Sequence, residues 1–328
     1  MKREFSLDLV RVLCTLWIVC VWHLSNYSDS WDISDCLICQ HVTRGVLFCF
    51  MFLSGFLLKK YDFKSKNNVI EFYRKRFVRF WPLFFLSSCS LYAGGLFLGY
   101  PWFKDAPHFL LCILGLSSFS MPQPSTLWFM SMLMFFYIIT PFVKKSRFVG
   151  VLIVIAMFLI YYYVRKGQAD FSFVPYSIGY FVGLLYSDRI VGRISNSWII
   201  RLSSIITIIL VSWFGTHFDS LLSNRIILTF YTIISSLILV LLLISWTEYI
   251  ANFRTNGKAI VEWLSYSSFA LYLFHRQVYQ LLSYAMNHLG LEVSVLVLII
   301  VFIPVAVLVS YFIQRLYDAF LKRCTTSR

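Results

Sequence analysis

The sequence predicts an all-α membrane protein, a polytopic bundle of about ten transmembrane helices plus one short re-entrant or interfacial segment, forming a single domain over 1–328. Hydrophobic residues make up 59% of the chain, its mean hydropathy is +0.74, and 13% of its residues are charged. A soluble domain carries about 25% charged residues. Apolar runs near the ~20 residues that cross a bilayer as a helix recur along the chain. Strand-like alternation is missing from the sequence, which favours a helix bundle over a barrel.

Eleven apolar runs are candidates for membrane-spanning helices. The run at 108–120 is short and has prolines around it, so we interpret it as the re-entrant or interfacial segment. Ten spans then remain, which places both ends of the chain on the same side of the membrane. The eleven runs lie at 7–27, 44–58, 80–99, 108–120, 127–143, 148–164, 173–187, 196–214, 225–246, 263–286 and 292–314.

Positive charges are distributed unevenly between the predicted loops. The net charge is +14, with 29 Lys and Arg residues. If both termini are cytoplasmic, most of these residues fall on the inner side, including those at 59–79 and 144–147. The positive-inside rule favours this orientation, and it explains the charge without a nucleic-acid partner. Some of the basic residues are also expected to bind anionic lipid head groups or a phosphorylated donor.

Most of the eight cysteines lie in apolar runs, and we interpret them as small buried hydrophobic residues. Cys36 and Cys39 differ, because they fall in a predicted polar loop beside His41. Their spacing allows a local disulfide or a metal site. Zinc normally takes four protein ligands in a structural site, and only three are present, so no metal is expected.

Ionisable side chains inside the predicted spans are functional candidates, because each costs about 2.5–3.5 kcal/mol on insertion scales. Arg11 lies near the inner end of the first span, His23 near its outer end, and the His275–Arg276 pair within the span at 263–286. Each also has a structural interpretation. Arg11 can reach the inner surface, His23 can be an interfacial hydrogen-bonding residue, and His275 can bridge two helices.

Carboxylates are absent from the depths of the predicted spans, and Asp8 at the start of the first is the nearest. This argues against a carboxylate proton relay and against a paired-carboxylate glycosidase. A neutral imidazole is well suited to take a proton from a hydroxyl near pH 7.

Five motifs occur in order along most of the chain. The first is the Arg11…His23 pair within 7–23, and the others lie at 50–58 (FMFLSGFLL), 76–82 (RFVRFWP), 127–141 (LWF…Y…P) and 265–275 (SYSSFALYLFH). Together they resemble the motifs of acyltransferase family three, the bacterial membrane acyltransferases that O-acetylate surface and secreted glycans.

Two features depart from the family's pattern. The family usually has ten residues between the Arg and the His, and here there are eleven. On a regular α-helix the family's spacing brings the two side chains within about 20° of each other, whereas the spacing here leaves them about 120° apart. A π-bulge, or a long reach of Arg11, would restore a shared direction. Many members also carry a Glu after the tryptophan of the LWF motif, and this chain has none there.

The resemblance implies acetyl-CoA or another acyl-CoA as the donor, arriving from the cytoplasm, and a polysaccharide or lipid-linked glycan as the acceptor. It also implies the bacterial inner membrane as the location. We expect Arg11, Arg76 and Arg79 to bind the donor phosphates, because a guanidinium can bind two oxygens. His23 is expected to deprotonate the acceptor hydroxyl, and His275 to be an acceptor ligand or a second base. Direct transfer and a covalent acyl intermediate both fit the sequence.

Two other functions fit the same pattern. A transporter or flippase for a lipid-linked saccharide would use the 19% of aromatic residues to stack on sugars, and it would need no acyl-CoA. A non-catalytic partner in envelope assembly would tolerate substitution of His23 or Arg11. The acyl group, the acceptor sugar and its position, the side of the membrane on which transfer occurs and the oligomeric state stay open.

Overall fold

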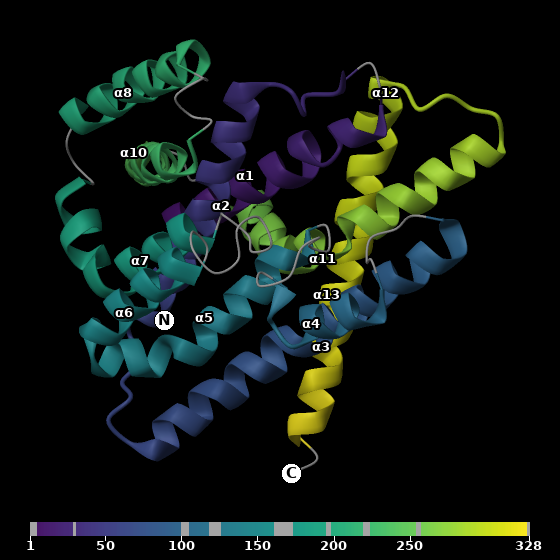
Figure 1. The fold of residues 1–328 in the computed structure, drawn as a ribbon. Coiled ribbons are helices and arrows are strands. Elements are labelled where there is room, and N and C mark those ends of the chain that lie inside the picture. Colours follow the sequence, from purple (N-terminus) through teal and green to yellow (C-terminus); the bar gives the residue numbers. More distant parts are fainter. Residues whose placement is uncertain are drawn as a thin grey trace.

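The structure, a computed structural model, is helical in every regular element of the part of the chain that it describes, which confirms the all-α class (Figure 1). Residues 5–28, 31–99, 105–117, 126–160, 173–194, 198–218, 224–253 and 257–326 are described. Within them, six helices are long and apolar enough to cross a membrane, so the expected count of about ten spans is not confirmed. These six are Phe5–Tyr27, Leu37–Leu58, Lys66–Leu98, Leu127–Lys145, Ile226–Ala251 and Val295–Arg323.

The helices follow the predicted runs in order. The ends of three predicted apolar runs, at 118–120, 161–164 and 196–197, lie outside the described residues. The elements are α1 (Phe5–Leu16), the π-helix η1 (Trp17–Trp22), the 3-10 helix η2 (Ser25–Tyr27), α2 (Leu37–Leu58), α3 (Lys66–Leu98), the short α4 (Ala106–Ile113), α5 (Leu127–Lys145), α6 (Arg147–Leu159), α7 (Phe173–Ile194), α8 (Trp198–His217), α10 (Arg225–Phe253), α11 (Lys258–His288), α12 (Val295–Val297), the π-helix η6 (Leu298–Phe302) and α13 (Ile303–Thr326).

Two helices begin well before the predicted spans, because polar side chains cap them there. The Ser65 hydroxyl accepts a hydrogen bond from the backbone of Asn68 and starts α3 inside the basic segment. The Cys36 thiol accepts one from the Cys39 backbone N–H and starts α2. Cys39 and His41 therefore lie in a helix, and the expectation that they sit in a loop was wrong. Both thiols are free, and the pKa of Cys36 lies below its usual value because the Cys39 side chain donates to it.

Helices α2 and α7 touch backbone to backbone. A Cβ on Gly55 would lie 2.8 Å from the backbone nitrogen of Leu184, and one on Gly183 would lie 2.9 Å from the carbonyl carbon of Phe52. Such contact between small residues is typical of helix packing in membranes. Gly55 and Gly183 therefore allow the close approach of these two helices.

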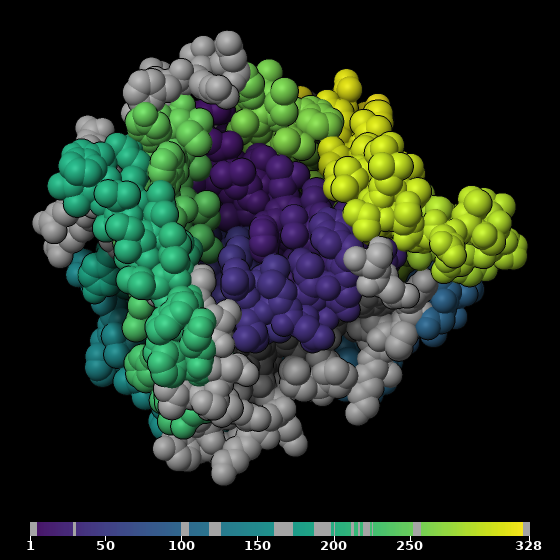
Figure 2. All heavy atoms as spheres, turned by 90° about the horizontal axis from the view of Figure 1, so that it is seen from above, coloured from purple at the N-terminus to yellow at the C-terminus, as the bar shows by residue number. Residues whose placement is uncertain are grey.

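Helix α11 is the polar centre of the bundle. It packs on α1, α3 and α13, and its buried face carries polar side chains, which explains why it is not among the six apolar helices. Helices α1 and α11 run parallel, since Asp8 contacts Ser265 and His23 contacts His275. In the view of Figure 2, α1, η1 and α2 (purple to indigo) lie in the middle of one face, between α8 and α10 and the yellow C-terminal helices.

Two of the segments predicted to face the cytoplasm, those at 59–79 and 144–147, contact each other. Lys144 of α5 donates to the Lys59 carbonyl after α2, at 2.6 Å. Farther along α3, Pro82 cannot donate to the Val78 carbonyl four residues earlier, and the Tyr317 hydroxyl of α13 donates to it instead. Contacts therefore join the inner parts of helices that are far apart in sequence.

Candidate active site

A π-helix separates Arg11 from His23. Its last turn is closed by the His23 backbone N–H, which donates to the Ile18 carbonyl five residues earlier at 2.9 Å. Each π-turn takes up one residue more than an α-turn, so η1 absorbs the extra residue in this chain's Arg-to-His spacing. Arg11 and His23 both contact α11 as a result.

The π-helix is held in place from two sides. The indole N–H of Trp17 donates to the Thr43 hydroxyl of α2 at 2.9 Å. The Tyr279 hydroxyl of α11 donates to the Val19 carbonyl at 3.3 Å. These side chains fix the segment that aims His23.

His23 and His275 form a buried dyad. The Nδ1 atom of His23 lies 2.8 Å from the Nε2 atom of His275, and the two rings are nearly parallel, with an interplanar angle of 8°. His23 keeps 8% of its surface exposed, whereas His275 is fully buried. Of the two histidines, His23 is thus the one that keeps some accessible surface.

The backbone fixes which nitrogen of each ring carries a proton. The Nδ1 atom of His275 lies 3.0 Å from the Leu271 carbonyl oxygen, which can only accept, so this nitrogen must donate. In a neutral ring the Nε2 atom of His275 is then an acceptor, and the Nδ1 atom of His23 must donate to it. The Nε2 atom of His23 is left with a lone pair, which is the state a general base requires.

Arg276 lies beside the dyad. It is 6% exposed, and its guanidinium is within electrostatic range of both imidazoles and of Tyr272. His275 and Arg276, which are neighbours on α11, therefore both lie close to His23. A buried cation next to two neutral rings favours any negative charge that develops there.

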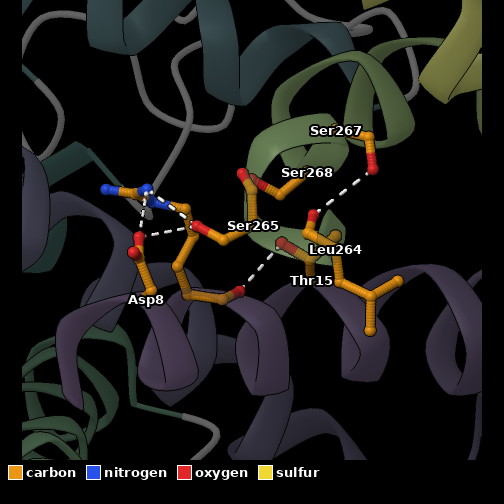
Figure 3. Close-up of polar contacts among 7 residues, drawn as sticks. Asp8, Thr15, Leu264, Ser265, Ser267 and Ser268 are labelled. Carbon is orange, nitrogen blue, oxygen red and sulfur yellow. Dashed lines mark hydrogen bonds and ion pairs between the residues drawn. The ribbon is translucent and has the colours of Figure 1, made fainter. Parts of the chain in front are cut away.

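Arg11 is held at the other end of the contact between α1 and α11. Its guanidinium lies 3.2 Å from the Asp8 carboxylate and 3.2 Å from the Ser265 hydroxyl, and Ser265 also donates to Asp8 at 2.6 Å. Figure 3 shows Asp8 and Ser265 facing each other across the two helices. The Arg11 side chain is 28% exposed and that of Asp8 is 6% exposed. Sequence reasoning missed Ser265 and underrated Asp8.

The two arginines of α3 that are expected to bind the donor, Arg76 and Arg79, differ in their surroundings. Arg76 donates to the Tyr61 hydroxyl at 3.1 Å, and its guanidinium lies 5.6 Å from the ring centre of Tyr137. Arg79 is exposed. A hollow of 230 Å³ lies at the start of α3, and neither Arg76 nor Arg79 lines it. Its lining residues are Lys60, Tyr61, Asp62, Asn68, Glu71, Phe72 and Lys75. In the part of the chain that the structure describes, no group of three or more His, Cys, Asp or Glu residues is placed to hold a metal ion.

Comparison with known proteins identifies the chain at the level of the family. The sequence profile described as "Acyltransferase domain" matches residues 4–315, nearly the whole chain. The chain belongs to acyltransferase family three. No curated protein and no solved structure matches it. Membership of this family identifies the protein as a membrane acyltransferase.

The motifs that resemble acyltransferase family three meet around α11. Phe50 of the second motif and Phe129 of the fourth both contact Tyr272, with ring centres 6.2 and 5.9 Å away. Phe80 of the third motif contacts Phe269 at 5.2 Å. Since α1 carries the first motif and α11 the last, the five segments surround one interior region of the bundle.

The π-helix leads to a prediction about the number of residues between Arg11 and His23. Deleting Val21 should convert η1 to a regular α-helix and restore the family's usual spacing, so His23 should still reach His275. Inserting one alanine after Cys20 should turn the segment before it by about 100° relative to His23. We expect acyl transfer within about tenfold of wild type for the deletion and a loss of at least about 100-fold for the insertion. Transfer assays on both purified variants check this, and equal losses would contradict it.

Proposed function

We propose that the protein is an O-acyltransferase that moves an acyl group, most commonly acetyl, from acyl-CoA to a hydroxyl of a cell-surface or secreted polysaccharide. The observation that carries the proposal is the chain of hydrogen bonds from the Leu271 carbonyl through His275 to His23. This chain leaves the Nε2 atom of His23 with a free lone pair. His23 is also the member of the dyad that retains exposed surface.

The chemistry requires one base. His23 Nε2 takes the proton of the acceptor hydroxyl as that oxygen attacks the thioester carbonyl carbon. The tetrahedral oxyanion that forms is favoured by the positive charge of Arg276. The carbon–sulfur bond then breaks, and the proton on His23 passes to the departing thiolate of CoA. His275 touches no substrate in this scheme and acts as a positioning residue for His23.

The donor is bound at the basic end of the bundle. Phe269, which contacts Phe80 next to Arg79, lies one turn from Ser265, which contacts Arg11. Arg11 on α1 and Arg79 on α3 therefore lie at a similar level along α11, and the phosphates of an acyl-CoA are assigned to this end. This end faces the cytoplasm in the proposed ten-span arrangement, with both termini inside, in the bacterial inner membrane.

Removing a phosphate contact should weaken donor binding alone. Arg79→Gln is expected to raise KM for acetyl-CoA about tenfold, the cost of one charge-assisted hydrogen bond, with kcat nearly unchanged. Lys322→Gln removes an exposed charge near the end of α13 and should leave both constants as in wild type. Equal effects of the two variants would argue against a specific donor site on α3.

The decisive test of the proposal uses labelled acetyl-CoA. Purified protein in lipid nanodiscs is given the labelled donor with de-O-acetylated surface polysaccharide. Transfer of label to the polysaccharide supports acyl transfer. If no label is transferred to any glycan while the protein moves a lipid-linked saccharide across vesicles, the protein is a transporter and the proposal fails.

A further inference from the structure

The outer half of α11 meets a row of small residues on α3. The Ser87 hydroxyl donates to the Leu273 carbonyl at 2.7 Å. One turn later, the Gln277 amide donates to the hydroxyls of Ser87 and Ser90, at 2.8 and 3.1 Å. Gly94 follows one turn after Ser90 along α3, and Gln280 follows Gln277 along α11. These contacts place the two helices side by side and in parallel.

Gln280, at the end of this row, is a buried amide whose hydrogen-bonding capacity is not fully used. Its side chain is 1% exposed, and its amide nitrogen has no hydrogen-bond partner among the described residues. Its oxygen lies near Gly94, where a Cβ would be 3.7 Å from it and, apart from its chain neighbours and the backbone of its own helix, within 4 Å of no other atom. A buried amide without a hydrogen-bond partner is unfavourable, and nearly all such groups in proteins find one. The absence of a side chain at Gly94 leaves room for a further group beside this amide.

Gln277 adds a matching acceptor. Its amide nitrogen is used by Ser87 and Ser90, but its oxygen is buried without a partner among the described residues. The two glutamines, three residues apart on one helix, thus offer one unused donor and one unused acceptor. A hydroxyl group can both accept from the first and donate to the second.

The row connects to the reacting centre through Arg276. Gln280 lies four residues after Arg276, so the two project from the same face of α11. Arg276 is itself in electrostatic range of His23 and His275. Gln280 is about 7.5 Å beyond His275 along the helix axis, on the opposite side from Ser265 and Arg11. A hydroxyl-rich molecule bound there lies away from the end assigned to the donor phosphates.

We infer that Gln280 and Gln277, with Gly94 opposite them, form a subsite that binds hydroxyl groups of the saccharide acceptor next to the sugar that is acylated. The inference rests on the proposed function and assigns its acceptor site. The amide groups of pantetheine share the same hydrogen-bonding chemistry, so the test must separate acceptor from donor.

The test measures binding before catalysis. Oligosaccharides from the de-O-acetylated polysaccharide are titrated calorimetrically into the full-length protein in nanodiscs without acetyl-CoA. Gln280→Leu, which keeps the side-chain size, should raise the acceptor Kd about tenfold, because the amide loses its hydrogen bonds to the saccharide. Gly94→Leu should raise it at least as much by filling the space, whereas Gly94→Ala should leave it near the wild-type value. Leu281→Ala, on the exposed neighbour of Gln280, is the matched control.

Steady-state constants then separate the two substrates. The inference expects Gln280→Leu to raise KM for the polysaccharide about tenfold and to leave KM for acetyl-CoA unchanged. A raised KM for acetyl-CoA with unchanged saccharide Kd would assign the subsite to the donor and overturn the inference, and so would equal saccharide Kd values for wild type and Gln280→Leu. Weakened saccharide binding in a protein that transfers no acetyl would keep the subsite and refute acyl transfer.

Discussion

Replacing His23 with alanine is expected to lower acyl transfer by about 10²- to 10⁴-fold, the range that a positioned general base contributes. The loss should fall on kcat, because His23 acts on the acceptor proton and binds no phosphate of the donor. The measurement is transfer of labelled acetyl groups by the purified variant, with kcat and both KM values determined.

Two controls keep this prediction specific. His288→Ala removes an exposed histidine at the end of α11 and should retain wild-type transfer. Size-exclusion profiles of the His23→Ala protein in detergent should match wild type, which shows that the dyad is not required for folding. Normal transfer by the folded His23→Ala protein would remove the base from the mechanism and favour a function that does not depend on this histidine.

The sequence was sufficient to predict the helical class. Together with the family resemblance, it also suggested that Arg11 and His23 face a common interior. It also showed that their spacing is one residue too long for a regular helix. The position of the π-helix could not be predicted, because the segment from Trp17 to Trp22 contains no glycine or proline to mark it. Contacts from Thr43 and Tyr279, which are distant in sequence, hold the π-helix in the fold.

The polar lining of α11 was also hard to predict. A search for ionisable groups in apolar runs found His275 and Arg276 but passed over Ser265 and Gln280, since uncharged polar residues are common in ordinary helices. The pairing of Asp8 with Arg11 was missed for a related reason. Asp8 lies at the start of a predicted span, where water would normally solvate a carboxylate, whereas the structure buries it against Ser265. Neighbouring helices create these environments, and a single sequence does not show which helices meet.

Replacing His275, the hydrogen-bond partner of His23, is expected to have the second large effect on kcat. In a Ser-His-Asp triad, replacing the Asp so that the histidine adopts the wrong tautomer lowers kcat by about 10⁴-fold. Here a neutral imidazole, fixed by the Leu271 carbonyl, takes the place of the carboxylate. His275→Leu removes the acceptor for the His23 Nδ1 proton and leaves that group buried. We expect kcat to fall by about 10²- to 10³-fold with both KM values nearly unchanged, since a neutral partner orients less strongly than a carboxylate.

A rescue variant separates positioning from packing. The side-chain oxygen of glutamine reaches about as far as the Nε2 atom of histidine, whereas that of asparagine is one bond shorter. His275→Gln should therefore supply an acceptor to His23 and recover about tenfold of the activity lost in His275→Leu, and His275→Asn should not. Kinetics on the three folded variants decide the matter. If leucine, asparagine and glutamine give the same kcat, His275 only bridges α1 and α11, and the tautomer of His23 must be set in another way.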